Sequence, residues 1–332
     1  MDTIFQKLRF NLFLLFIFTS LIIAQTGYKT IVKLTDMPDE VLLKKMERNS
    51  TELLSEINTA FFQNRKPEVS AEILTTEARR ILGQLWETSP FRCYETQIIG
   101  RVLQMSSLDE KAFQVRNIPV FIKNIFEKED TTINYQEICM NYNSSGLIEN
   151  IFYSLESNRY HRLLSDGVSV TDIKRRAFIL EFIENFRTAY NRKDIKFLEE
   201  VYGEDALIIT GKVIQTKPSE ISSTISGRRI EYKVSRKTEY LQAVKDKIFT
   251  KNNYVNIIFE EINISRDKGY DYMYGVTLKQ YWNTTNYSDV GYLFLMIDFK
   301  NESKPIIHVR TWQPEEWIKQ GEQVFNLGDF AF

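Results

Sequence analysis

The hydrophobic positions of this chain are spaced first as in helices and then as in strands, and this order occurs twice. In the first half, apolar residues three or four positions apart predict helices at 40–65 and 75–87, the second with Thr75 or Thr76 as its N-cap. The segments between residues 93 and 157 alternate apolar and polar positions, which predicts strands. The Asn-Ser-Ser-Gly run at 143–146 separates two of them and predicts a hairpin turn.

The second half repeats this pattern. Asp172 is the expected N-cap of a long helix at 173–193, and shorter helices are predicted at 195–202 and 238–250, with a strand at 206–214 between them. The four closing strands are VNIIFEEINIS (255–265), MYGVTLKQYW (273–282), GYLFLMIDF (291–299) and IIHVRTW (306–312).

Helices followed by antiparallel strands, twice over, predict an α+β protein with two tandem domains. The first domain is expected at 40–165 and the second at 170–318, with a connector at 155–172. A length of 332 residues suits two domains of ordinary size. The closing strand at 291–299 is apolar on both faces, as expected of a central strand that is covered on both sides.

The first 24 residues have the composition of a signal peptide. Lys7 and Arg9 precede an apolar run at 10–23, and Ala24 offers a cleavage position. The run is shorter than the roughly 20 residues of a membrane-spanning helix, so cleavage is expected, with an uncleaved anchor as the alternative. The expected location is periplasmic, at the cell surface or secreted.

Composition narrows the chemistry. A net charge of −1 gives no reason to expect a nucleic-acid partner. With two His and two Cys the sequence presents no cluster of metal ligands, and it has no dinucleotide-binding or phosphate-binding motif, so neither a metal nor a cofactor is expected. Cys93 and Cys139 either form a disulfide, which export would permit, or are separate buried residues.

Residues 176–314 resemble exported bacterial proteins of the nuclear transport factor 2-like superfamily. The resemblance lies in FRTAYNRKDIKFLEEVYGEDALIITGKVI and in the segments GVTLKQYW, SDVGYLFLMIDF and PIIHVRTWQP. Residues 40–165 resemble it through the order of elements and the hairpin NYQEICMNYNSSGLIENIFY. The resemblance implies that each domain is a cone, formed by a curved antiparallel sheet wrapped around helices, with a pocket. The superfamily contains isomerases, dehydratases and cyclases as well as non-catalytic binding and dimerisation domains, so the fold alone does not choose between them.

The closing strands carry the aromatic and cationic candidates. Strand alternation places His308, Arg310 and Trp312 on one face, and Gln280 and Trp282 share a face of another strand. Ile307, Val309 and Thr311 point to the opposite face. If this set, with its smaller apolar residues, faces the helices, then His308, Arg310 and Trp312 lie on the outer face of the sheet. We interpret these residues as a packing surface against the other domain or a second subunit. A ligand site that uses the ring faces and the guanidinium is the alternative, and a catalytic His308 is not expected.

Two carboxylates are candidate acids. Asp298 ends an apolar strand, where burial would raise its pKa, but the polar turn after it favours a position near solvent. Asp205 lies with Tyr202 and Tyr190 near the helix-to-strand corner that the resemblance places at the rim of the cone, and we interpret it as a cap or turn carboxylate. No residue is assigned a catalytic role.

We therefore expect an exported, non-catalytic binding or assembly protein of the cell envelope. Its partner would be a small apolar ligand or a protein, and packing between domains or in a homodimer would use the outer sheet faces. No stable membrane span is expected after signal cleavage. The alternative is an isomerase, dehydratase or cyclase that uses a carboxylate in the second cone. The abundance of Phe (23) and Tyr (17) and the scarcity of His favour the first.

Overall fold

The computed structural model describes residues 27–106, 111–123, 135–165, 170–215 and 228–330. The predicted signal peptide lies outside these ranges. The described residues divide into two compact units with the boundary between Ile151 and Phe152, inside a strand and before the predicted connector. Leu155 and Tyr160, which fall within the predicted first domain, pack in the core of the second unit. The α+β class with two sheets is confirmed.

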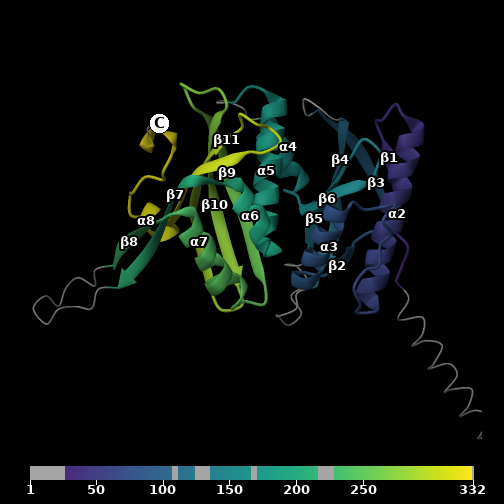
Figure 1. Ribbon diagram of the computed structural model, residues 1–332, viewed down its shortest axis with the longest axis horizontal. Coiled ribbons are helices and arrows are strands. Elements are labelled where there is room, and N and C mark those ends of the chain that lie inside the picture. The colour runs from purple at the N-terminus through teal and green to yellow at the C-terminus, as the bar shows by residue number, and fades with distance from the viewer. Residues whose placement is uncertain (1–26, 107–110, 124–134, 166–169, 216–227, 331–332) are drawn as a thin grey trace, which may run out of the picture. The chain divides into compact units, whose positions relative to one another are not determined.

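The first unit is a six-stranded sheet with two helices (Figure 1). Its elements are β1 (Ile31–Thr35), α2 (Glu40–Phe62), α3 (Thr76–Thr88), β2 (Phe91–Cys93), β3 (Gln97–Ser106), β4 (Lys111–Ile122), β5 (Tyr135–Tyr142) and β6 (Ile148–Tyr153). The strand order is β1-β3-β4-β5-β6, and β2 pairs with β4. The predicted N-cap Thr75 and the predicted turn at 143–146 are confirmed. Strand β1, parallel to β3, was not predicted.

The second unit has one sheet and several helices. Its elements are α4 (Ser157–Ser165), α5 (Ile173–Asn191), α6 (Ile195–Val201), β7 (Tyr202–Gln215), β8 (Arg228–Ser235), α7 (Lys237–Ala243), the π-helix η1 (Val244–Phe249), β9 (Val255–Arg266), β10 (Met273–Thr284), β11 (Ser288–Asp298), β12 (Ile306–Pro314), α8 (Glu315–Ile318) and the 3-10 helix η2 (Leu327–Asp329). Asp172 caps α5, as predicted, by accepting hydrogen bonds from the backbone N–H groups of Lys174 and Arg175.

The sheet of the second unit has the order β8-β7-β12-β11-β10-β9. Neighbouring strands are antiparallel except for β12 and β7, which are parallel. The sheet curves around α5, α6 and α7 (Figure 1), and side chains from both the helices and the strands form the main core. One face of the sheet, here called the inner face, therefore packs against the helices.

One extra residue in β12 changes which side chains reach the inner face. Val309 pairs with Met296 and Ile307 pairs with Ile297, so His308 is a bulge without a partner in β11. Ile307 belongs to the main core, whereas Val309 packs with the apolar residues of the outer face. Two residues that simple alternation would place together thus face opposite ways, because a bulge breaks the period of two.

The outer face of the same sheet is covered by the end of the chain. Phe294 and Met296 of β11 pack there with Phe325, Leu327 and Phe330, and the rings of Phe294 and Phe330 are stacked with centroids 5.5 Å apart. The central strand is covered on both sides, as predicted. The expected cover was the other domain or a second subunit, but part of it is residues 325–330 of this chain, here called the tail.

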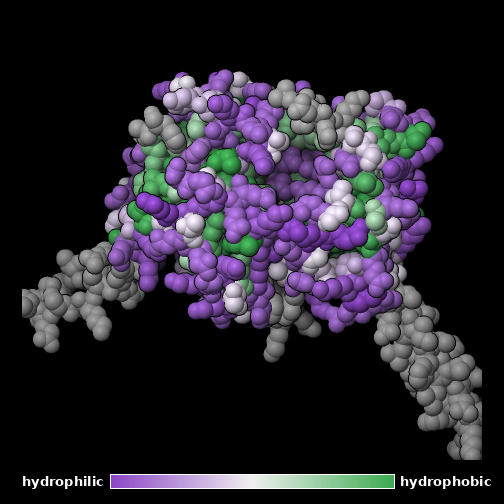
Figure 2. Space-filling model, viewed as in Figure 1, coloured by the Kyte–Doolittle hydropathy of each residue, from purple (hydrophilic) through white to green (hydrophobic). Residues whose placement is uncertain are grey.

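The remaining predictions on the backbone can be placed. Cys93 and Cys139 are both buried and no disulfide joins them, so the prediction of a disulfide was wrong and the alternative of separate buried residues is confirmed. Across the ranges that the structure describes, no helix is both long and apolar enough to cross a membrane. On the face of the second unit visible in Figure 2, apolar residues form small separate patches among hydrophilic ones.

Gly275 provides a test of the contact between the tail and the sheet. A Cβ at this position would lie 2.6 Å from Cγ of Leu327 and 2.9 Å from Cε2 of Phe294. Gly275→Ala should therefore lower the free energy of unfolding by about 1–3 kcal/mol through overpacking, as measured by urea denaturation. It should also speed proteolysis within the tail.

Gly269→Ala is the matched control, because its Cβ would meet only Oδ1 of Asp267, at 3.4 Å. Equal stability of the two variants would show that the tail does not press on the sheet at Gly275.

Candidate functional site

The inner face of the second unit holds a pocket of about 340 Å³. Its lining comes from β7, β10, β11 and β12 on the sheet side and from α7 and η1 on the helix side. Trp282, Trp312 and Ile248 supply large apolar surfaces. The volume lies in the range of small-molecule sites, and aromatic walls are typical of such sites.

Arg310 is the cation of this pocket. Its side chain lines the cavity and the residue is only 4% exposed. Cζ lies 5.0 Å from the centre of the Tyr240 ring, which gives a cation–π contact. Two guanidinium nitrogens, Nε and Nη1, are buried without a hydrogen-bond partner, and no carboxylate of the described residues forms an ion pair with Arg310. A buried guanidinium with unpaired nitrogens is costly.

Three tyrosines surround this guanidinium without neutralising it. The hydroxyl of Tyr190 lies 3.0 Å from that of Tyr202 and 2.8 Å from that of Tyr240. Burial, together with the neighbouring hydroxyls, raises the pKa of Tyr190 and of Tyr202 well above the ordinary value for tyrosine, although Arg310 opposes the shift. The hydroxyls therefore stay neutral at physiological pH, and the positive charge at Arg310 has no phenolate partner.

The π-helix η1 brings further polar groups to the pocket. Lys247 of η1 adds a second cation to the lining, and Asn252 follows η1 on the same side. Asn252 is 9% exposed, and its side-chain Oδ1 is buried without a partner. The sequence predicted one regular helix at 238–250. The wider turn of a π-helix, often found at functional sites, shifts the side chains that follow it.

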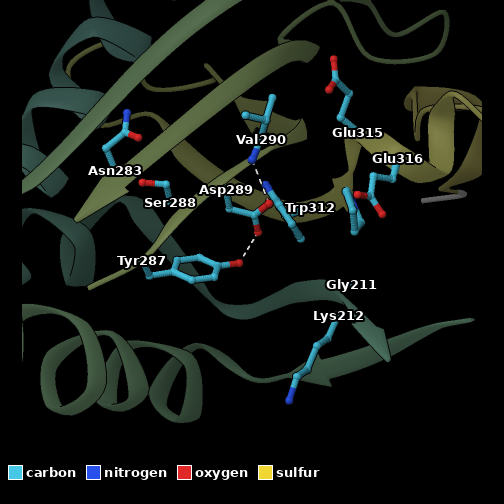
Figure 3. A pocket seen from close by; sticks show the side chains of 11 residues that line it. Gly211, Lys212, Asn283, Tyr287, Ser288, Asp289, Val290, Trp312, Glu315 and Glu316 are labelled. Carbon is cyan, nitrogen blue, oxygen red and sulfur yellow. Dashed lines mark hydrogen bonds between the residues drawn. The ribbon is translucent and has the colours of Figure 1, made fainter. Parts of the chain in front are cut away.

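Asp289 lies at the mouth of the pocket, where a second and larger hollow of about 750 Å³ begins. Tyr287, Asp289 and Trp312 line both cavities. The Asp289 carboxylate accepts hydrogen bonds from the hydroxyl of Tyr287 and, at 2.8 Å, from the backbone N–H of Val290 (Figure 3). Burial raises the pKa of Asp289, with a smaller contribution from Glu316, while the two hydrogen bonds oppose the shift.

Gly291 allows the ring of Trp312 to lie against β11. A Cβ at Gly291 would lie 2.8 Å from Cε2 and Cζ2 of that ring and 2.3 Å from the carbonyl oxygen of Gln313. Any larger residue there would push the indole out of place. The glycine thus fixes one wall of the pocket.

Four of the residues predicted from the sequence line this pocket together: Gln280, Trp282, Arg310 and Trp312. The predicted outer-face position of Arg310 and Trp312 was wrong, because the bulge at His308 turns both side chains inward. The alternation of β10 was predicted correctly, because Trp282 lies in the core with Val276 and Leu278. This face packs on the helices of the same unit, whereas the expected contact was the other domain or a second subunit. Tyr190 and Tyr202 lie in the core beside the pocket and reach it through Tyr240.

The other three predicted residues lie elsewhere. Asp298 and His308 are partly exposed, with Oδ2 and Nε2 3.6 Å apart, and neither lines the pocket. The Asp298 carboxylate also accepts a hydrogen bond of 2.6 Å from the backbone N–H of Lys300, in the turn that was expected to keep it near solvent. Asp205 is exposed near the start of β7.

Sequence reasoning missed Asp289, Tyr240 and Asn252. The run NTTNYSD ending at Asp289 has the composition of a turn, but a carboxylate that enters a central strand directly after a turn is a usable signal. Nothing local marks Asn252, because its role depends on the turn that follows the π-helix. Among the described residues no group of three or more His, Cys, Asp or Glu is placed to hold a metal ion.

Comparisons with known proteins found solved structures that align with part of this chain. No family model matches the chain, and no curated protein matches it. Among solved structures, Bd1075 of Bdellovibrio bacteriovorus aligns with 51% of this chain at 16% identity and a TM-score of 0.32, and the match spans 47% of that protein. An NTF2-like protein of Cytophaga hutchinsonii aligns with 42% of this chain at 12% identity and a TM-score of 0.31, over 98% of its own length.

ActVI-ORFA of Streptomyces coelicolor also aligns with 42% of this chain, at 9% identity and a TM-score of 0.31, over 96% of its own length. The chain thus spans about half the length of the Bdellovibrio protein and nearly all of the other two. The Cytophaga protein bears the name of the superfamily that the sequence resembles. At these identities and TM-scores, the solved structures give no information about the site of this chain.

The unpaired state of Arg310 can be tested through stability. Arg310→Met keeps most of the apolar stem and removes a buried charge that has no ion-pair partner, at the loss of the cation–π contact and of a side-chain hydrogen bond with Tyr190. The free energy of unfolding should stay the same or rise by about 1–2 kcal/mol, as measured by chemical denaturation.

Arg192→Met is the matched control with the opposite expected sign. Arg192 is as deeply buried, but its Nε and Nη2 donate to Oδ2 of the buried Asp194 at 3.1 and 2.9 Å. Removing this partner should cost about 3–5 kcal/mol because it leaves a buried carboxylate. If Arg310→Met destabilised the protein to a similar extent, Arg310 would be a structural residue.

Proposed function

We propose that the second unit binds a small organic anion with an apolar or aromatic body, in an exported and non-catalytic protein. The observation that supports this most directly is Arg310, buried in the wall of an aromatic pocket with two unpaired nitrogens. This is the ligand-site alternative considered from the sequence, now with the pocket that it requires.

The charge balance favours an anionic ligand. A bound carboxylate would pair with Arg310 away from bulk water, where such charge-assisted hydrogen bonds are strongest. It would also remove the cost of the unpaired nitrogens, which is about 1–3 kcal/mol for each unsatisfied buried group and larger for charged ones. Lys247 adds a second positive charge to the lining.

The walls favour an apolar or aromatic body. Trp282 and Trp312 both line the cavity, and Trp282 is held edge-on to Tyr190 with ring centroids 5.6 Å apart. A rigid indole surface of this kind binds a flat ring with little loss of conformational entropy. The polar Gln280, 4% exposed, also lines the pocket and can orient such a ligand.

Binding can be tested with a series of phenylalkanoates of increasing chain length and the matching neutral primary amides, by isothermal titration calorimetry. The wild-type protein should prefer the acid by at least about tenfold, which corresponds to about 1.4 kcal/mol. In Arg310→Met this preference should disappear.

Arg266→Met serves as the control, because Arg266 is exposed and is not part of the pocket lining. This variant should bind the acids as the wild type does. An acid preference that survives in Arg310→Met would contradict the proposal.

A second function is favoured by one observation, the position of Asp289. It has a raised pKa, lines the same pocket and is oriented by Tyr287, as is needed of a group that exchanges protons with a bound molecule. An isomerase, dehydratase or cyclase would use this carboxylate rather than Asp298 or Asp205.

The two functions differ in the effect of Asp289→Asn. For a binding protein the substitution should leave phenylalkanoate affinity within about threefold of the wild type, with no turnover in either protein. An enzyme that uses Asp289 would show exchange of ligand C–H protons with deuterated solvent, followed by NMR, and the substitution should slow it at least a hundredfold. Exchange in the wild type that Asp289→Asn abolishes would replace the non-catalytic proposal.

A further inference from the structure

Asn252 lines the pocket that Arg310 also lines, and its side chain has an unpaired hydrogen-bond acceptor. Its backbone N–H and its side-chain Nδ2 both donate to the carbonyl oxygen of Ile248, at 3.1 and 2.9 Å. These bonds fix the orientation of the side-chain amide, because the nitrogen must face that carbonyl. Oδ1 therefore points the other way, and it is buried without a partner.

The backbone around Asn252 is tied to the mouth end of the strands. The N–H of Asn253 donates to Oγ1 of Thr285 at 2.9 Å, and Nδ2 of Asn286 donates to the carbonyl of Lys251 at 3.3 Å. Thr285 and Asn286 form the turn between β10 and β11. Asn252 therefore lies at the same end of the pocket as Asp289, which follows this turn.

Arg310 lies at a different position along the strands from Asn252 and Asp289. In the register of the sheet Arg310 pairs with Leu295, whereas Asp289 pairs with Trp282, and the two positions are six residues apart along β11. At roughly 3.3 Å per residue this is about 20 Å along the strand, less the reach of the side chains toward one another. The pocket thus runs from a donor-rich, cationic floor to a mouth with acceptor groups.

The mouth has more acceptor capacity than the protein uses. Oδ1 of Asn252 has no partner, and the carboxylate of Asp289 accepts one bond at each oxygen, from Tyr287 and from Val290. Each carboxylate oxygen can accept a second hydrogen bond. An unpaired buried acceptor costs about 1–3 kcal/mol, and a ligand that supplies a donor there would recover this cost.

We infer that the ligand carries, at the end opposite its anionic group, a hydrogen-bond donor such as a hydroxyl or an amine, which Asn252 binds. Its chemical class is then an elongated hydroxyaryl or aminoaryl acid, with the acid at Arg310 and the donor at the mouth. This inference rests on the proposed function, because it takes the anion site at Arg310 as given.

The test uses pairs of phenylalkanoates that carry either a hydroxyl or a methyl group at the para position, which are close in size, again by calorimetry. At the chain length that spans the pocket, the hydroxyl form should bind the wild type at least about tenfold more tightly than the methyl form. In Asn252→Leu this ratio should fall to about one, while the methyl form keeps its affinity.

Asn252→Asp is the rescue variant, because it keeps an acceptor oxygen at the same position while losing the bond to the carbonyl of Ile248. If it restores the preference for the hydroxyl form, the loss in Asn252→Leu does not come from misfolding.

The outcomes separate the two proposals. Equal affinity for the hydroxyl and methyl forms at every chain length, with binding that still depends on Arg310, would overturn the inference and leave the proposed function standing. If no member of the series binds in a manner that depends on Arg310, the proposed function fails and the inference fails with it. A hydroxyl preference unaffected by Asn252→Leu would also overturn the inference.

Discussion

The pocket of the second unit depends on one extra residue in β12. The bulge at His308 lets Ile307 pack in the core and then turns Arg310 inward, so a strand that begins as ordinary core continues as the cationic wall of a cavity. Without the bulge, Val309 would face the tyrosines and the guanidinium would point to the outer face.

The cluster of Tyr190, Tyr202 and Tyr240 sets the electrostatics around that charge. Three neutral hydroxyls stabilise a cation through their dipoles and through the ring of Tyr240, yet they do not neutralise it. The site therefore holds a charge at some cost in folding free energy, which is the usual relation between stability and function at binding sites. Replacing one tyrosine by a carboxylate would favour folding and remove the preference for an anion.

Local features were predictable from the sequence, and features set by tertiary pairing were not. The cap at Asp172, the helix it begins and the four closing strands depend on spacing within a few residues, so the pattern of the chain contains them. The bulge depends on which residues of β11 lie opposite β12, and the π-helix depends on a single inserted residue in a pattern that still looks helical. This is why Arg310 and Trp312 were predicted on the wrong face of the sheet, and why Asn252 was missed.

The tail on the outer face has a consequence for any partner of the second unit. Because Phe325, Leu327 and Phe330 are joined covalently to the sheet that they cover, they compete for it at an effective concentration that is typically in the millimolar range for a short flexible connection. A protein that binds this face from solution must displace them, and its apparent affinity falls by the fraction of time that the face is uncovered. The tail thus sets a minimum affinity that a free partner has to exceed to bind this face.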